Sequence, residues 1–78
     1  MKVGDLVIYK DGVTWLDYTF VIVDKLQFVK YNGGTDKCIK VAVLSEPDDP
    51  RRRDKDFSIG TTLPWEEEKF WEVINESR

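Results

Sequence analysis

Three consecutive arginines at positions 51 to 53, with Lys55 close behind, are the residues best suited to chemical recognition. Arginine is always charged and bonds phosphate through two parallel donors, so the run could clamp a nucleic-acid backbone. Residues 46 to 56, however, hold five acids against four bases, and a self-neutralised run releases few counterions from nucleic acid. The sequence therefore favours a solvated loop with locally paired charges. Nucleic-acid binding is the alternative, through Arg51, Arg52, Arg53 and Lys55.

Side chains for catalysis or metal binding are scarce. The chain has no histidine, which removes the usual general base and the commonest zinc ligand. The carboxylates of residues 66 to 68 are consecutive, so on a helical turn they point in different directions and cannot converge on one ion. Cys38 is the only cysteine, which excludes an internal disulfide, and it has no base to activate it. The sequence predicts a protein that is not an enzyme and that uses no cofactor or metal.

Large aromatic side chains offer another means of recognition, because they are rigid and lose water readily. A protein-binding surface would draw on Trp15, Tyr18, Tyr31, Trp65 and Trp71. The competing interpretation is burial, which is favoured for Trp15 and Tyr18. A chain of 78 residues has a small core and needs its large side chains to fill it.

Strand-forming residues dominate the elements that must position these side chains. We expect strands over residues 6–9, 19–24, 26–31 and 38–44, with an aromatic loop over 13–18. Asn32-Gly33-Gly34 predicts a hairpin turn of type I′, which needs two residues at positive φ. In the fourth strand Ile39, Val41 and Val43 alternate with smaller or polar residues, which predicts one buried face.

The second half of the chain is less regular. Residues 45–56 contain two prolines and no large apolar side chain, which predicts a mobile charged loop. Residues 57–63 resume strand-like chemistry, with Gly60 a predicted bend or bulge. Pro64 and the glutamates after it favour one helical turn over 64–68, followed by a closing strand over 69–74. The alternative is a β-sheet with a C-terminal helix.

Both faces of the first two predicted strands are apolar, although a half-exposed sheet should alternate with polar residues. Leu6 and Ile8 lie opposite Val7 and Tyr9, and the second strand repeats the pattern. Something must therefore cover the second face. The candidates are the chain's own loop and terminal segment, or a second copy in a symmetric homodimer.

The segments VGDLV at 3–7 and WEVI at 71–74 resemble the first and last strands of SH3-like barrels, the class that includes Tudor and KOW modules. The ending and the size resemble small SH3-like proteins of tailed bacteriophages. This resemblance implies an all-β, five-stranded SH3-like barrel over residues 1–78, with paired terminal strands and one short helical turn before the last. The chain lacks the ALYDY-like stretch of signalling SH3 domains, so binding of proline-rich peptides does not follow.

The mild net charge of −3 argues against a sequence-independent nucleic-acid binder. No apolar run approaches the length of a membrane span, and the sequence predicts no membrane association and a cytoplasmic protein. The resulting hypothesis is a non-enzymatic accessory module that binds a protein partner or oligomerises. The resemblance places it in the host cytoplasm as a phage-encoded protein. A virion structural component is a second alternative.

Overall fold

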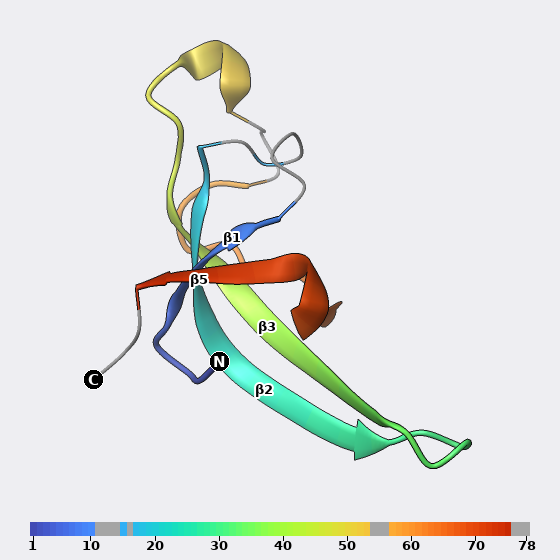
Figure 1. The fold of residues 1–78 in the computed structure, drawn as a ribbon. Helices are drawn as coiled ribbons and strands as arrows, with labels where there is room; N and C mark the ends of the chain where they lie inside the picture. The colour runs from blue at the N-terminus through green and yellow to red at the C-terminus, as the bar shows by residue number, and fades with distance from the viewer. Residues whose placement is uncertain (11–14, 16, 54–56, 76–78) are drawn as a thin grey trace.

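The computed structural model describes residues 1–10, 15, 17–53 and 57–75. Over these residues the chain forms one antiparallel sheet in the order β4-β3-β2-β1-β5 (Figure 1). Its elements in chain order are β1 (Leu6–Tyr9), β2 (Thr19–Val29), β3 (Thr35–Ser45), the 3-10 helix η1 (Pro50–Arg52), β4 (Glu66–Glu67), the 3-10 helix η2 (Glu68–Phe70) and β5 (Trp71–Asn75). The all-β prediction is confirmed, and the alternative of a C-terminal helix is wrong, because Trp71–Asn75 is a strand.

The first and last strands lie side by side, as the sequence predicts. Val7 lies opposite Val73, and Tyr9 lies opposite Trp71. β4 and β5 lie at opposite edges of the sheet, yet only the three residues of η2 separate them in the chain. Three residues span roughly 10 Å at most, so the sheet must curl until its two edges approach each other.

The predicted helical turn exists, but it occupies residues 68–70 and not 64–68. Glu66 and Glu67 stay extended because they pair with Ile39 and Cys38 of β3. Pairing with the sheet therefore outweighs the helix-start signal of the glutamates, and the turn begins one residue after β4 ends.

β2 is the largest departure from the predicted strands. The segments 19–24 and 26–31 are not two strands, because a single strand runs from Thr19 to Val29. Asp24 and Lys25 pair with Lys40 and Ile39, so these polar residues do not interrupt the strand. A β-bulge, seen as a register shift between Ile22 and Asp24, lies where the strand passes from the core to the exposed arm. β3 is likewise longer than predicted and begins at Thr35.

The hairpin turn between β2 and β3 lies where the sequence predicts it. The Gly33 amide donates to the Lys30 carbonyl at 3.0 Å, and the Lys30 amide donates to the Gly34 carbonyl at 2.6 Å. The type I′ assignment is wrong, because Gly33, at φ +87°, is the only one of the three predicted turn residues with positive φ. This is the three-residue loop that ends in a left-handed glycine, in which a single residue needs the unusual conformation.

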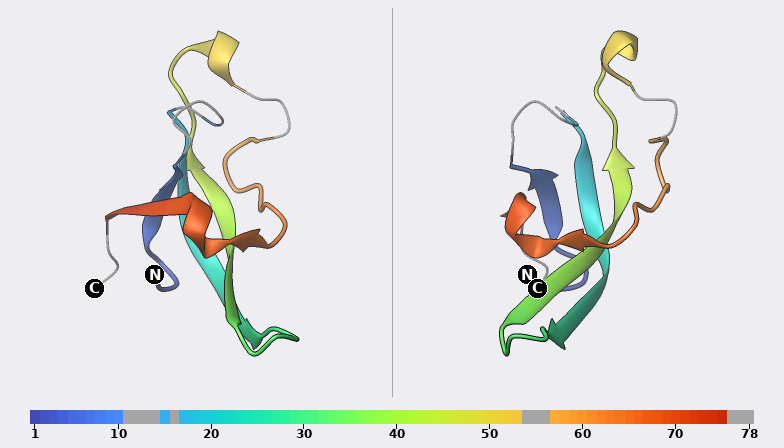
Figure 2. Two further views of the ribbon diagram at one scale, coloured as in Figure 1. Left: turned by 45° about the vertical axis from the view of Figure 1, so that its right-hand side comes forward. Right: turned by 90° about the vertical axis from the view of Figure 1, so that its right-hand side faces the viewer.

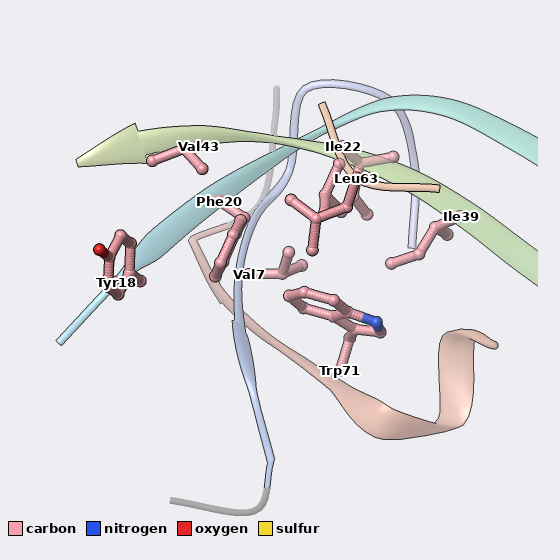
Figure 3. Packing of buried hydrophobic residues seen from close by; sticks show 9 residues of the cluster. Val7, Tyr18, Phe20, Ile22, Ile39, Val43, Leu63 and Trp71 are labelled. Carbon is pink, nitrogen blue, oxygen red and sulfur yellow. The ribbon is translucent and has the colours of Figure 1, made fainter. Parts of the chain in front are cut away.

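The core lies on the concave face of the sheet (Figure 3). Its buried members are Val7, Tyr18, Phe20, Ile22, Ile39, Val41, Val43, Leu63 and Trp71. Ile39, Val41 and Val43 point inward together, which confirms the predicted buried face of that strand. Trp71 packs edge-on against Phe20 at 5.1 Å between ring centroids, so β5 is held to β2 across the core.

The chain between β3 and β4 is mostly irregular. Asp49 caps η1 by accepting a hydrogen bond from the Arg51 amide at 3.0 Å. The predicted strand over 57–63 is not a strand of the sheet, but its second half lies along β3. An isolated bridge joins Thr62 to Ala42, and the Gly60 and Leu63 amides donate to the carbonyls of Val43 and Val41. Gly60 adopts φ +91°, as expected of the predicted bend. Residues 54–56 of the predicted charged loop lie outside the described residues.

The molecule is elongated, with principal extents of 45 × 27 × 19 Å. The far half of the β2–β3 hairpin projects beyond the body, and its tip lies at the opposite end of the molecule from η1 (Figures 1 and 2). We call this projection, residues 24–37, the arm. β1 reaches only Val21 of β2, and β4 contacts β3 only at Cys38 and Ile39, so most of the arm is a two-stranded ribbon.

Candidate protein-binding arm

Apolar side chains line the arm without cover. Leu26 lies opposite Cys38 and Phe28 lies opposite Asp36, so Leu26 and Phe28 share one face of the ribbon. Leu26 is 45% exposed and Phe28 is 43% exposed. A two-stranded ribbon is a single layer and has no second layer to bury its side chains. Side chains of this size at such exposure are suited to contact with another protein.

The tip of the arm is still more exposed. Val29 is 73% exposed, and Tyr31 in the turn is fully exposed. Lys30 flanks them, and its ammonium pairs with Asp36 at 2.8 Å. The hydrogen bond and the charge of Asp36 raise the pKa of Lys30 above its ordinary value, so this lysine stays protonated. The tip therefore combines the ion pair of Lys30 and Asp36 with apolar surface.

The arm has an open backbone edge along β2. Hydrogen bonds alternate along an antiparallel pair, and Lys30 directs its amide toward β3. Lys25, Gln27 and Val29 therefore direct their amides and carbonyls away from β3. The Lys25 amide agrees with this pattern, because it donates instead to the Asp24 carboxylate at 2.8 Å. On this side Ile22 still exchanges hydrogen bonds with Gly4 and Asp5, and among the described residues no strand pairs with β2 beyond it.

The exposed apolar surface continues from the arm onto the body. Val23 and Leu44 are exposed on the body, and the Lys40 ammonium lies 5.9 Å from the centre of the exposed Trp65 ring. Leu6 and Ile8 on the second face of β1 are half-buried. The chain itself thus covers the second face of the sheet only in part.

The five aromatic residues predicted for a binding surface divide between the core and the surface. Trp71 and Tyr18 are buried. Trp15 is partly buried, and its ring lies 5.7 Å from that of Trp71 in a stacked arrangement. The burial interpretation of Trp15 and Tyr18 agrees with these positions. Tyr31 and Trp65 remain accessible to a partner, one at the arm tip and the other beside Lys40.

The three arginines of the charged loop each have a carboxylate partner. Arg51 lies 3.5 Å from Asp49, as local pairing predicts. Arg52 pairs with the distant Asp17 at 2.7 Å, and this pair ties η1 to the segment before β2. Arg53 lies 3.5 Å from a carboxylate oxygen of Glu46 and donates to the Pro47 carbonyl at 2.8 Å. Lys55, the fourth basic residue of this alternative, lies outside the described residues.

A cleft of about 450 Å³ lies between η2 and the outer half of the arm, where Lys30, Thr35, Asp36 and Lys37 line it. Charges of both signs line it, among them Lys10, Lys37, Lys69, Glu67 and Glu68. Trp71 also contributes to its wall, and the buried indole nitrogen of Trp71 has no hydrogen-bond partner among the described residues. The mixed charges favour no single class of ligand. No group of three or more His, Cys, Asp or Glu residues in the described chain is placed to hold a metal ion.

Sequence reasoning placed Leu26 and Phe28 in a strand but not in the candidate site. The signal was their alternation with Lys25 and Gln27, which predicts one apolar side of a strand. What the sequence did not reveal was that no layer packs over that side.

The chain matches no protein-family model, no curated protein and no solved structure. No helix in the described part of the chain is long and apolar enough to cross a membrane.

Proposed function

We propose that this chain is a non-enzymatic accessory module that binds protein and that the arm is its contact element. The observation that carries the proposal is the uncovered apolar face of the arm, formed by Leu26 and Phe28 and continued by Tyr31 at the tip. Exposed apolar surface that is shared by neighbouring side chains often marks a site of protein–protein contact. Aromatic residues at the tip add rigid contact area at low entropic cost.

We propose further that the body is an SH3-like barrel. The strand order β4-β3-β2-β1-β5, the pairing of the terminal strands and the position of η2 between the last two strands support this assignment. The resemblance of VGDLV and WEVI to the first and last strands of that class adds to it. The setting that goes with this resemblance, a phage protein acting in the host cytoplasm, belongs to the same proposal.

A capture experiment with matched variants tests the protein-binding function. The chain is immobilised and exposed to a lysate of the cells that produce it. We expect the double variant Leu26→Ser with Phe28→Ser to lose the proteins that the wild type retains. Ile59→Ser is the control, because Ile59 is exposed on the body away from the arm. If the double variant and the control retain the same proteins as the wild type, the arm is not the contact element.

A further inference from the structure

We infer that two copies of this chain pair through the open edge of β2, antiparallel, with Gln27 on the two-fold axis. This inference rests on the proposed function and deepens it by naming the partner of the arm as a second copy. The pairing joins the two β2 strands into one continuous sheet across the axis. It uses the amide and carbonyl of Gln27, the amide of Val29 and the carbonyl of Lys25, all of which face outward.

The backbone edge is prepared for such pairing. An edge lysine usually discourages a second strand from docking. Here the Lys25 ammonium donates to the Met1 carbonyl oxygen, which draws this charge onto its own chain. The Asp24 carboxylate accepts a hydrogen bond from the Lys25 amide. Gln27 and Val29 then present the amides that a partner strand can use, and Val29 is largely exposed.

The side chains of the edge are complementary to themselves in this register. With Gln27 opposite its own copy, Leu26 lies opposite Phe28 of the partner subunit, and Asp24 lies opposite Lys30 of the partner subunit. The two-fold axis repeats both contacts. Apolar side chains thus meet apolar ones and an acid meets a base, as favourable cross-strand pairs require.

Neighbouring registers lack this match. A shift of two residues one way places Asp24 opposite Phe28 of the partner subunit, and the same shift the other way places Leu26 opposite Lys30 of the partner subunit. Either arrangement loses the contact between Asp24 and Lys30 of the partner subunit and opposes a charge to an apolar side chain on the face of Leu26 and Phe28. The proposed register opposes Lys25 to Val29 of the partner subunit on the other face, where the Lys25 ammonium is bonded to the Met1 carbonyl. A foreign peptide could use the same backbone groups, but the complementary row of side chains is present in the chain itself. This self-complementarity is the reason for choosing a second copy over a foreign strand.

The charge of Lys30 is available for this contact. Its ammonium carries three donors, and one carboxylate oxygen of Asp36 lies 2.8 Å from it. A second carboxylate, that of Asp24 from the partner subunit, can therefore bond to the same ammonium. Asp24 and Lys30 share the face of Leu26 and Phe28 by the alternation of the strand.

Cysteine cross-linking tests the register directly. In a Cys38→Ser background, Gln27→Cys should form a disulfide-linked dimer under mild oxidation. The two copies of this residue would face each other as a hydrogen-bonded pair, with Cα atoms about 5.5 Å apart, within disulfide reach. Val29→Cys in the same background is the control. Its two copies would be separated by four residues along the strands, about 13 Å, and should not cross-link. Equal cross-linking of both variants, or none of either, overturns the proposed pairing.

Sedimentation velocity over a wide range of concentration provides a second test. The wild type should pass from monomer to dimer with increasing concentration. Phe28→Lys should remain a monomer, because it places a charge opposite Leu26 of the partner subunit, while Ile59→Lys should still dimerise. A wild type that stays monomeric throughout overturns the self-pairing. If its arm still retains other proteins in the capture experiment, the proposed function stands without it.

Discussion

At the scale of single residues, the buried ring of Trp71 packs against several other aromatic rings. Three other rings, those of Tyr9, Trp15 and Phe20, lie within 6 Å of its own. It stands on the edge strand β5, so this packing ties the edge of the sheet to its centre. The sequence predicts Trp71 as a protein-binding residue because large, rigid aromatic side chains are common at binding surfaces. Burial of the same ring is what a chain of this size needs.

We expect Trp71→Ala to lower the free energy of unfolding by about 3–5 kcal/mol, because it leaves a large cavity in the core. Domains of ordinary stability have only about 5–15 kcal/mol in total, so the variant should lie close to unfolding. Urea denaturation followed by far-ultraviolet circular dichroism measures the change. Trp65→Ala is the matched control and should cost below about 1 kcal/mol, as is usual for surface residues. Similar losses in the two variants would contradict the assignment of Trp71 to the core.

The residue types alone could not separate core from surface among the five predicted aromatics. Tyr31 follows Lys30 and precedes a glycine-rich turn, a context that does favour exposure. Trp15 and Tyr18 lie in the segment before β2, where burial depends on Phe57, a residue distant in sequence whose ring is 5.3 Å from that of Trp15. Arg52 shows the same limit, because its partner Asp17 is 35 positions away and local spacing could not reveal it.

At the scale of elements, the hairpin turn decides how the arm ends. Gly33 adopts φ +87°, a conformation that side chains with a Cβ rarely take. A Cβ added there would meet no atom within 4 Å, so strain in the backbone is the only obstacle to substitution. The rest of the turn is ordinary, since the Asn32 side chain accepts a hydrogen bond from the Gly34 amide at 3.0 Å.

Gly33→Ala should therefore destabilise the arm by about 1–2 kcal/mol through left-handed strain alone. Gly33→Asn should cost less, because asparagine tolerates this region better. Hydrogen exchange of the arm amides measures the effect, and we expect faster exchange in the alanine variant with little change in the amides of the core. Equal exchange in the wild type and Gly33→Ala would mean that the turn does not depend on its left-handed residue.

The sequence predicted the turn and the alternation of β3, because both depend on neighbouring residues. It divided β2 in two because Asp24 and Lys25 look like the end of a strand. Their partners Lys40 and Ile39, supplied by β3, keep the strand intact through the bulge. The reach of a strand is thus set by the length of its partner, which no local window contains. For the same reason the sequence could predict that Leu26 and Phe28 share a side but not that this side lacks cover.

At the scale of the whole molecule, the distribution of charge bears on the choice of binding partner more than on the stability of the fold. The chain carries a net charge of −3, and the described arginines of the charged loop all have carboxylate partners. Exposed ion pairs of this kind contribute about 0–1 kcal/mol each to stability. Replacement of the three arginines should therefore leave the fold in place and make the net charge of the molecule more negative.

The triple variant Arg51→Ala, Arg52→Ala and Arg53→Ala tests the nucleic-acid alternative. We expect the wild type to show no binding to single- or double-stranded oligonucleotides at moderate salt, and the triple variant to behave identically. Fluorescence anisotropy of labelled oligonucleotides over a salt series measures this. Binding by the wild type that falls steeply with salt and disappears in the variant would favour the nucleic-acid function instead.

β2 and β3 each run without interruption from the packed body to the exposed hairpin. The pairing that places Val29 opposite Thr35 extends, through the β-bulge between Ile22 and Asp24, to the pairing that places Phe20 opposite Val43 under the core rings. The arm is therefore anchored in the body by both of its strands. A pull applied near Tyr31 would be transmitted along both strands to the aromatic packing around Trp71, so mechanical load on the far end and the cohesion of the interior are directly linked.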